Sequence, residues 1–125
     1  MNLNQVTLPS IDPENSVRFY QLLGLRLIVD ALPRYARMEC PDGASTLSIH
    51  LVEKLPQGEL PTLYFETERL DEEYQRLKEA KVNFDLAPTD QSWLWREARL
   101  KDPDGNPLIL FFAGKNRKNP PWRVA

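Results

Sequence analysis

Hydrophobic and polar residues alternate in short runs along most of the chain, a pattern typical of strands that bury one face. The pattern first occurs in residues 4–10, where Val6 and Leu8 alternate with Gln5 and Thr7. Similar runs predict further strands at residues 25–31, 35–40, 45–54, 62–67, 82–88, 94–102 and 106–112.

Residues 12–25 have the spacing of a helix instead. Asp12 is a suitable N-cap, Pro13 suits the first helical position, and Gly24 can end the helix in the left-handed conformation. The inward stripe of this helix is expected to consist of Val17, Tyr20 and Leu23.

The spacing of apolar residues in 70–82 predicts a second helix. Asp71 is the expected cap, and Tyr74 and Leu77 are expected on one face together with the stem of Lys81.

The order of these elements repeats within the chain. A strand, a helix and three strands occur in residues 4–54 and again in residues 62–113, and Pro-Asp-Gly turns begin at Pro41 and Pro103. Such a repeat predicts an α+β fold of two βαβββ modules. We expect a single domain over residues 1–125, with residues 114–125 as a C-terminal tail.

Composition narrows the range of partners and locations. The 125 residues are 42% hydrophobic and have a net charge of −2, so no positive field favours nucleic acid. No run reaches the ~18 apolar residues of a membrane span. The N-terminus lacks a basic leader, and the single Cys40 cannot form an internal disulfide. A cytoplasmic protein is expected.

Three segments carry a family resemblance: "QVTLPSIDPENSVRFYQLLGL", "LYFETERLDEEYQRLKEAKV" and "ARLKDPDGNPLILF". They resemble the vicinal oxygen chelate superfamily, which includes glyoxalase I, bleomycin-resistance proteins and extradiol dioxygenases. The resemblance implies that the two modules form a curved mixed sheet around a concave cavity, and that the protein is a homodimer. The shared phrases reflect helix packing and a hairpin turn, so they indicate a fold rather than a reaction.

In enzymes of this superfamily, His and Glu side chains from four strands hold a divalent metal ion. The corresponding positions here are Gln5, His50, Thr62 and Ile109. Only His50 is a good ligand, and one side chain binds a divalent ion weakly. The chain therefore resembles an atypical member that lacks most of the metal ligands, and no cofactor is expected unless a divalent metal uses a non-standard site.

Strand parity selects the side chains that would line the cavity. If Leu47, Ile49 and Leu51 face outward, His50 faces the cavity, and it is the best candidate for a catalytic residue because imidazole can exchange a proton near neutral pH. The expected cavity residues are Gln5, His50, Thr62, Tyr64, Glu66, Trp93, Trp95, Glu97, Arg99, Ile109 and Phe111.

Three functions are open from the sequence. Trp93 and Trp95, beside Arg96 and Glu97, suit a planar or cationic small molecule that binds without a metal, although these rings could also cover the sheet or meet a second subunit. The alternatives are a metal-dependent lyase, isomerase or dioxygenase with a site around His50, or a non-catalytic interaction domain whose cavity is filled by its own side chains. The tail is either disordered or an arm that packs through Trp122.

Overall fold

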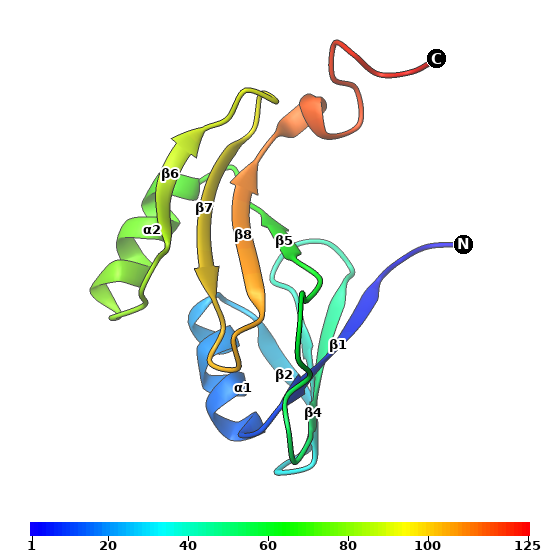
Figure 1. Ribbon diagram of the computed structural model, residues 1–125, viewed down its shortest axis with the longest axis vertical. Helices are drawn as coiled ribbons and strands as arrows, with labels where there is room; N and C mark the ends of the chain where they lie inside the picture. Colours follow the sequence, from blue (N-terminus) through cyan, green and yellow to red (C-terminus); the bar gives the residue numbers. More distant parts are fainter. The chain divides into compact units, whose positions relative to one another are not determined.

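The computed structural model describes all residues from 1 to 125 and contains two βαβββ modules, as predicted (Figure 1). The elements of the first module are β1 (Gln5–Ser10), α1 (Pro13–Leu22), β2 (Arg26–Ala31), β3 (Tyr35–Glu39) and β4 (Thr46–Leu51). Those of the second are β5 (Leu63–Glu66), α2 (Leu70–Glu79), β6 (Leu86–Asp90), β7 (Arg96–Lys101) and β8 (Pro107–Phe112), followed by the short 3-10 helix η1 (Gly114–Arg117). The predicted α+β class is confirmed.

Each module forms its own four-stranded mixed sheet. The strand orders are β1-β4-β3-β2 and β5-β8-β7-β6. In both sheets the first and last strands of the module pair in parallel, and the other neighbours are antiparallel. The second module therefore repeats the topology of the first.

The chain divides into two compact units. Unit 1 contains residues 1–59 and 102–106, and unit 2 contains residues 60–101 and 107–125. The single domain and the concave cavity expected from the sequence stay predictions. No helix is long and apolar enough to cross a membrane.

In unit 1, α1 packs against β2, β3 and β4. The Asp12 carboxylate accepts a hydrogen bond from the Asn15 backbone N–H at 3.2 Å, and Gly24 has a φ of +100°, so both predicted ends of this helix are confirmed. Tyr20 and Ile49 are fully buried between the helix and the sheet, whereas Leu51, expected to share the face of Ile49, is exposed at the end of its strand.

Residues 102–106, the turn between β7 and β8, complete unit 1 beside α1 (Figure 1). The Tyr20 hydroxyl donates to the buried Asp102 carboxylate at 2.6 Å, and the Asn106 side chain donates to the same carboxylate at 2.8 Å. The Ile11 backbone N–H donates to Asp104 at 3.0 Å. Burial and the Asp102 charge raise the pKa of Tyr20 far above its usual value.

In unit 2, α2 packs against β6, β7 and β8. Asp71 is not its cap: Arg69 occupies that position without a capping side-chain bond, because Leu70 is already helical and buried. The Arg69 guanidinium instead donates to Glu72 at 2.9 Å across the first turn. Asp71 pairs with Arg96 at 3.0 Å.

The strand predicted at residues 82–88 is also displaced. Lys81 lies beyond the end of α2 with a φ of 70°, and the strand begins only at Leu86. Phe84 packs edge-on against Tyr74 of α2, with ring centroids 4.7 Å apart. Phe84 therefore faces the helix, and only Asp85 of this stretch bonds to the sheet, through its backbone N–H to the Arg99 carbonyl at 2.7 Å.

Candidate functional site: the aromatic face and the polar face

The second sheet has one face rich in aromatic and charged side chains. Because directly paired residues on neighbouring strands project to the same side, the register places Tyr64, Ile109 and Arg99 together, and likewise Glu66, Phe111 and Glu97. We call this set the aromatic face; it consists of Tyr64, Glu66, Trp95, Glu97, Arg99, Ile109 and Phe111. The opposite side buries Ala98, Leu100, Leu108 and Leu110.

Three rings form the centre of the aromatic face. Trp95 stacks on Phe111 with centroids 4.5 Å apart and planes 16° apart. The Tyr64 ring stands nearly perpendicular to both, at 6.0 Å from Trp95 and 5.7 Å from Phe111. Phe111 is buried, whereas Tyr64 is 52% exposed and Trp95 is partly exposed. The exposed rings offer a flat apolar surface bounded by a perpendicular ring.

Glu97 is the buried charge of this face, with 2% of its surface exposed. Its carboxylate accepts hydrogen bonds from the Trp93 indole N–H at 3.1 Å and from the Arg99 guanidinium at 3.0 Å. Arg99 therefore neutralises Glu97, and Trp93 occupies the second carboxylate oxygen. This pair leaves no free charge at the centre of the face.

The Glu66 carboxylate also has hydrogen-bond partners within the chain. Its carboxylate accepts hydrogen bonds from the backbone N–H groups of Ala113 and Gly114, at 2.9 and 3.0 Å, where η1 begins. Arg117 lies 3.7 Å from the same carboxylate, and the Trp95 indole donates to the Asn116 carbonyl at 3.4 Å. Glu66 thus ties η1 to the sheet, and Trp122 further along the tail is 57% exposed.

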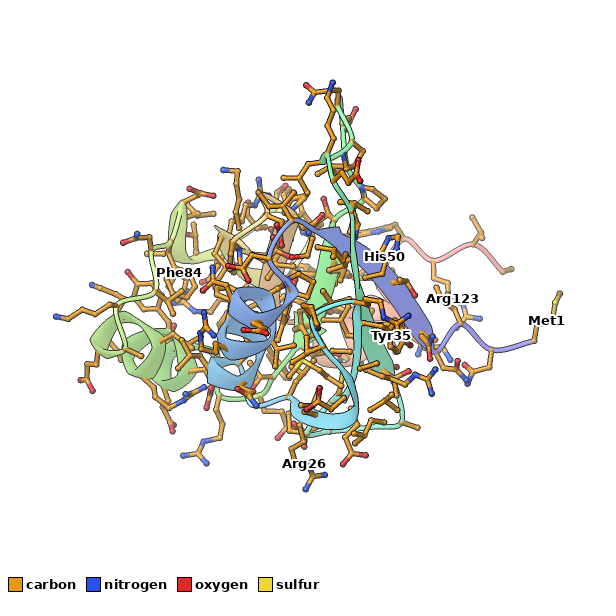
Figure 2. The ribbon with its side chains drawn as sticks, turned by 90° about the horizontal axis from the view of Figure 1, so that it is seen from below. Met1, Arg26, Tyr35, His50, Phe84 and Arg123 are labelled. Carbon is orange, nitrogen blue, oxygen red and sulfur yellow. The ribbon has the colours of Figure 1, made fainter.

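The first sheet carries a polar face at the corresponding positions. Register places Tyr35 beside His50 and Arg37 beside Ser48, and Figure 2 shows labelled Tyr35 and His50 on these neighbouring strands. We call this set the polar face; it consists of Gln5, Thr7, Arg26, Tyr35, Arg37, Glu39, Thr46, Ser48 and His50. His50 is exposed.

Tyr35, Arg37 and Ser48 form a compact hydrogen-bonded group on the polar face. The Tyr35 hydroxyl and the buried Ser48 hydroxyl lie 2.7 Å apart, and the Arg37 Nε–H donates to the Tyr35 oxygen at 3.1 Å. The Ser48 hydrogen bond, assisted by Arg37, lowers the pKa of Tyr35. Sequence reasoning missed this group because its members lie on two strands; the repeat was the available signal, since Tyr35 and Arg37 occupy the positions of Glu97 and Arg99.

The residues at the family's metal positions do not fit a divalent metal. Gln5 accepts a hydrogen bond from Thr46 at 2.9 Å, Thr62 is exposed just before β5, and Ile109 has no donor atom. Within neither unit do three or more His, Cys, Asp or Glu side chains converge. His50 alone cannot supply the several ligands that such an ion needs.

A pocket of about 180 Å³ in unit 2 lies beside the start of α2 and contains none of the predicted site residues. It is lined by Glu68, Arg69, Leu70, Asp71, Glu72, Arg96 and Phe112. Arg96, the one positively charged side chain that a strand contributes to this pocket, pairs with both Asp71 and Asp90 at 3.0 Å. Its charge is therefore already neutralised. The pocket is also smaller than the ~300 Å³ of ordinary ligand sites.

The chain belongs to the Glyoxalase/Bleomycin resistance protein/Dioxygenase superfamily, whose family model matches residues 2–110. The resemblance to the vicinal oxygen chelate superfamily is thereby confirmed. A search of curated protein sequences gave no match.

Solved structures share the fold. A glyoxalase/bleomycin resistance protein/dioxygenase from Nocardioides is 22% identical with a TM-score of 0.78, covering 100% of this chain and 90% of that one. A bleomycin-binding protein complexed with bleomycin is 22% identical with a TM-score of 0.73, covering 90% and 98%. Lactoylglutathione lyase from Agrobacterium tumefaciens is 13% identical with a TM-score of 0.74, covering 89% and 92%. At these identities the likeness concerns the fold alone.

Proposed function

We propose that the protein binds a planar aromatic small molecule on the aromatic face, without a metal ion. The observation that carries this proposal is the stack of Trp95 on Phe111, with Tyr64 standing perpendicular and half exposed. A planar ligand would stack on the outer surface of Trp95 and meet the edge of Tyr64, the two arrangements that aromatic pairs prefer.

Balanced charges around the rings favour an apolar mode of binding. Arg99 neutralises Glu97, and Arg117 lies near Glu66. Affinity would come from enclosing an apolar ring, and the Arg99 N–H groups that Glu97 does not engage would orient its polar substituents at the rim. The bleomycin-binding neighbour in the same fold supports a ligand-sequestering role for the chain.

The donor chemistry supports binding without a metal. Ile109 and Thr62 replace two family ligands, and Gln5 already accepts a hydrogen bond from Thr46. His50 would therefore act as a wall residue rather than as a metal ligand in this proposal.

A thermal-shift screen tests the proposal. Bleomycin and a panel of planar aromatic compounds, each with and without EDTA, are added to the purified protein. A ligand at ~100 times its Kd stabilises the folded state by about 2.7 kcal/mol, so the melting temperature should rise by several degrees and EDTA should leave that rise unchanged.

Two tryptophan variants locate the binding surface. Trp95→Ala should remove the ligand-induced rise, whereas Trp122→Ala, which removes an exposed ring of the tail, should preserve it. A rise that EDTA abolishes, or one that survives Trp95→Ala unchanged, would contradict the proposal.

A second candidate is the non-catalytic interaction domain. The specific observation in its favour is that Trp95 covers the buried cluster of Ile109, Phe111 and Ala113, so the chain's own ring already fills part of this face. In that case no small molecule of the panel would raise the melting temperature. The homodimer and the cytoplasmic location expected from the sequence stay predictions, and sedimentation of the purified protein tests the first of them.

A further inference from the structure

The polar face of unit 1 contains an arginine without an acidic partner. Arg37 is the only arginine on this face's two central strands, and it takes part in none of the ion pairs of the structure. The nearest acid along its own strand, Glu39, pairs with Arg26 at 3.0 Å instead. The face therefore has an uncompensated positive charge.

The second module shows what is missing from the first. Arg99 pairs across the sheet with Ile109 as Arg37 does with Ser48, and it donates to Glu97 two residues before it. In the first module Tyr35 stands at the position of Glu97. Exchange of a carboxylate for a phenol leaves the guanidinium hydrogen-bonded but not neutralised.

The hydrogen bonds around Tyr35 leave some of the donors of this group without a partner. Its oxygen accepts from the Arg37 Nε–H, and in the arrangement in which Ser48 donates, the oxygen accepts from Ser48 too. Both acceptor sites are then used, and the Tyr35 hydrogen is free to donate elsewhere. The two terminal nitrogens of Arg37 have no partner within the chain.

This group is a built arrangement rather than a loose surface charge. Ser48 is fully buried, Tyr35 and Arg37 are both half-buried, and the Arg37 guanidinium carbon lies 5.8 Å from the centre of the Tyr35 ring. The hydrogen bond from the Arg37 Nε–H to the Tyr35 hydroxyl and the contact of the guanidinium with the Tyr35 ring orient Arg37 before any ligand arrives. This orientation reduces the entropy lost on binding. The lowered pKa of Tyr35 agrees with a positive, donor-rich environment.

We infer that Tyr35 and Arg37 form an oxyanion-binding site, which takes a carboxylate or phosphate group of a small molecule. The terminal nitrogens of Arg37 would bind two oxygens of the anion side by side, as a guanidinium fork does with planar or tetrahedral oxyanions. The Tyr35 hydroxyl would donate to one of those oxygens, and Ser48 would hold the phenol in place. This inference does not depend on the aromatic face, which lies in the other unit.

Titration with inorganic phosphate and, separately, with acetate tests the inference. Both anions are titrated at constant ionic strength with chloride as the balancing ion, and binding is followed by NMR of the arginine Nε–H signals. The Arg37 signal should shift with saturation in the millimolar range. The relative affinities of the two anions distinguish a phosphate site from a carboxylate site.

Matched variants assign the effect to the proposed residues. Arg37→Gln should weaken phosphate and acetate binding at least tenfold, and Tyr35→Phe, which keeps the ring, should weaken it about threefold or more. Arg99→Gln removes the equivalent arginine of the second module and should change binding less than twofold. Circular dichroism and the melting temperature check that each variant is folded.

Either of two results would overturn the inference. The first is an Arg37 signal that does not shift with either anion. The second is a shift that Arg37→Gln and Arg99→Gln weaken equally, because that would indicate general attraction of anions to exposed arginines.

Discussion

The two modules share a topology and differ in the chemistry of the sheet face that their own helix leaves uncovered. Tyr35 and Arg37 in the first module stand where Glu97 and Arg99 stand in the second, with the same cross-strand pairing. In the second module the pair is neutral and surrounded by rings; in the first it is cationic and surrounded by hydroxyls. The helix-covered face of a repeat therefore specifies its shape, while the opposite face is free to differ in chemistry.

The largest expected effect comes from the turn that completes unit 1. Asp102→Ala should lower the free energy of unfolding by about 3 kcal/mol, because the buried Tyr20 hydroxyl and the Asn106 amide lose a charged acceptor. Asp42→Ala, in the matching exposed turn of the first module, should cost less than about 0.5 kcal/mol. Urea denaturation of both variants measures the difference; equal losses would mean that the two turns are structurally equivalent.

The aromatic face should contribute the next largest effect. Trp95→Ala removes the ring that covers Phe111 and should cost about 2 kcal/mol, below the value for a fully buried Trp because Trp95 is partly exposed. Trp122→Ala is the control, since that ring is largely in solvent. Urea denaturation that gave the same midpoint for both variants would show that the stack does not stabilise unit 2.

Alkaline pH should distinguish the helix-covered side of the first sheet from its polar face. The folded state raises the pKa of Tyr20, so above pH ~10 the unfolded chain loses this proton while the folded chain retains it. Stability should then fall with rising pH by up to about 1.4 kcal/mol per unit. Tyr20→Phe should remove this part of the slope.

Tyr35 should behave in the opposite sense. Its pKa is lowered in the folded state, so its ionisation favours folding as the pH rises from the folded value toward ~10. Tyr35→Phe should therefore remove this gain in stability below pH ~10 and leave the loss above pH ~10 unchanged. Unfolding measured between pH 8 and 11 compares both variants with the wild type, and identical slopes in all three would show that neither phenol has a shifted pKa.

The smallest effect on stability tests the comparison of the modules most directly. Glu97→Gln keeps the shape of the side chain and its contact with Trp93 but leaves Arg99 unpaired, at a cost of about 1 kcal/mol. The aromatic face should then acquire the anion binding inferred for the polar face, visible as a new phosphate-dependent shift of the Arg99 signal. Tyr35→Glu is the converse change and should abolish the shift at Arg37.

Sequence alone predicted the fold well because the core depends on alternation. Ala98, Leu100, Leu108 and Leu110 are buried on the side that the pattern indicated. The pattern failed where a competing contact decided the structure. The burial of Leu70 starts α2 before Asp71, and Phe84 packs on Tyr74 of α2 ahead of the strand.

The candidate site was only partly predictable. Parity assigned Tyr64, Glu97 and Phe111 to one face, since each strand fixes its own alternation. Hydrogen bonds between strands also need the register, which the sequence of one strand does not contain. The bond of Tyr35 to Ser48 depends on the register, and that of Tyr20 to Asp102 depends on the docking of a helix against a turn 82 residues away, so both emerged only from the structure.

The partnership of Tyr20 with Asp102 has a consequence for the newly made chain. These residues are 82 positions apart, and unit 1 includes the turn at 102–106. At a ribosomal rate of ~5–20 residues per second, Tyr20 is made about 4–16 s before Asp102 exists. From the completion of β4 at Leu51 until Asp102 is made, the first module has its helix and its four strands but lacks the carboxylate that accepts from Tyr20 in the finished protein. A ribosome-bound chain that ends before residue 102 should therefore be more accessible to protease than the same module in the finished protein.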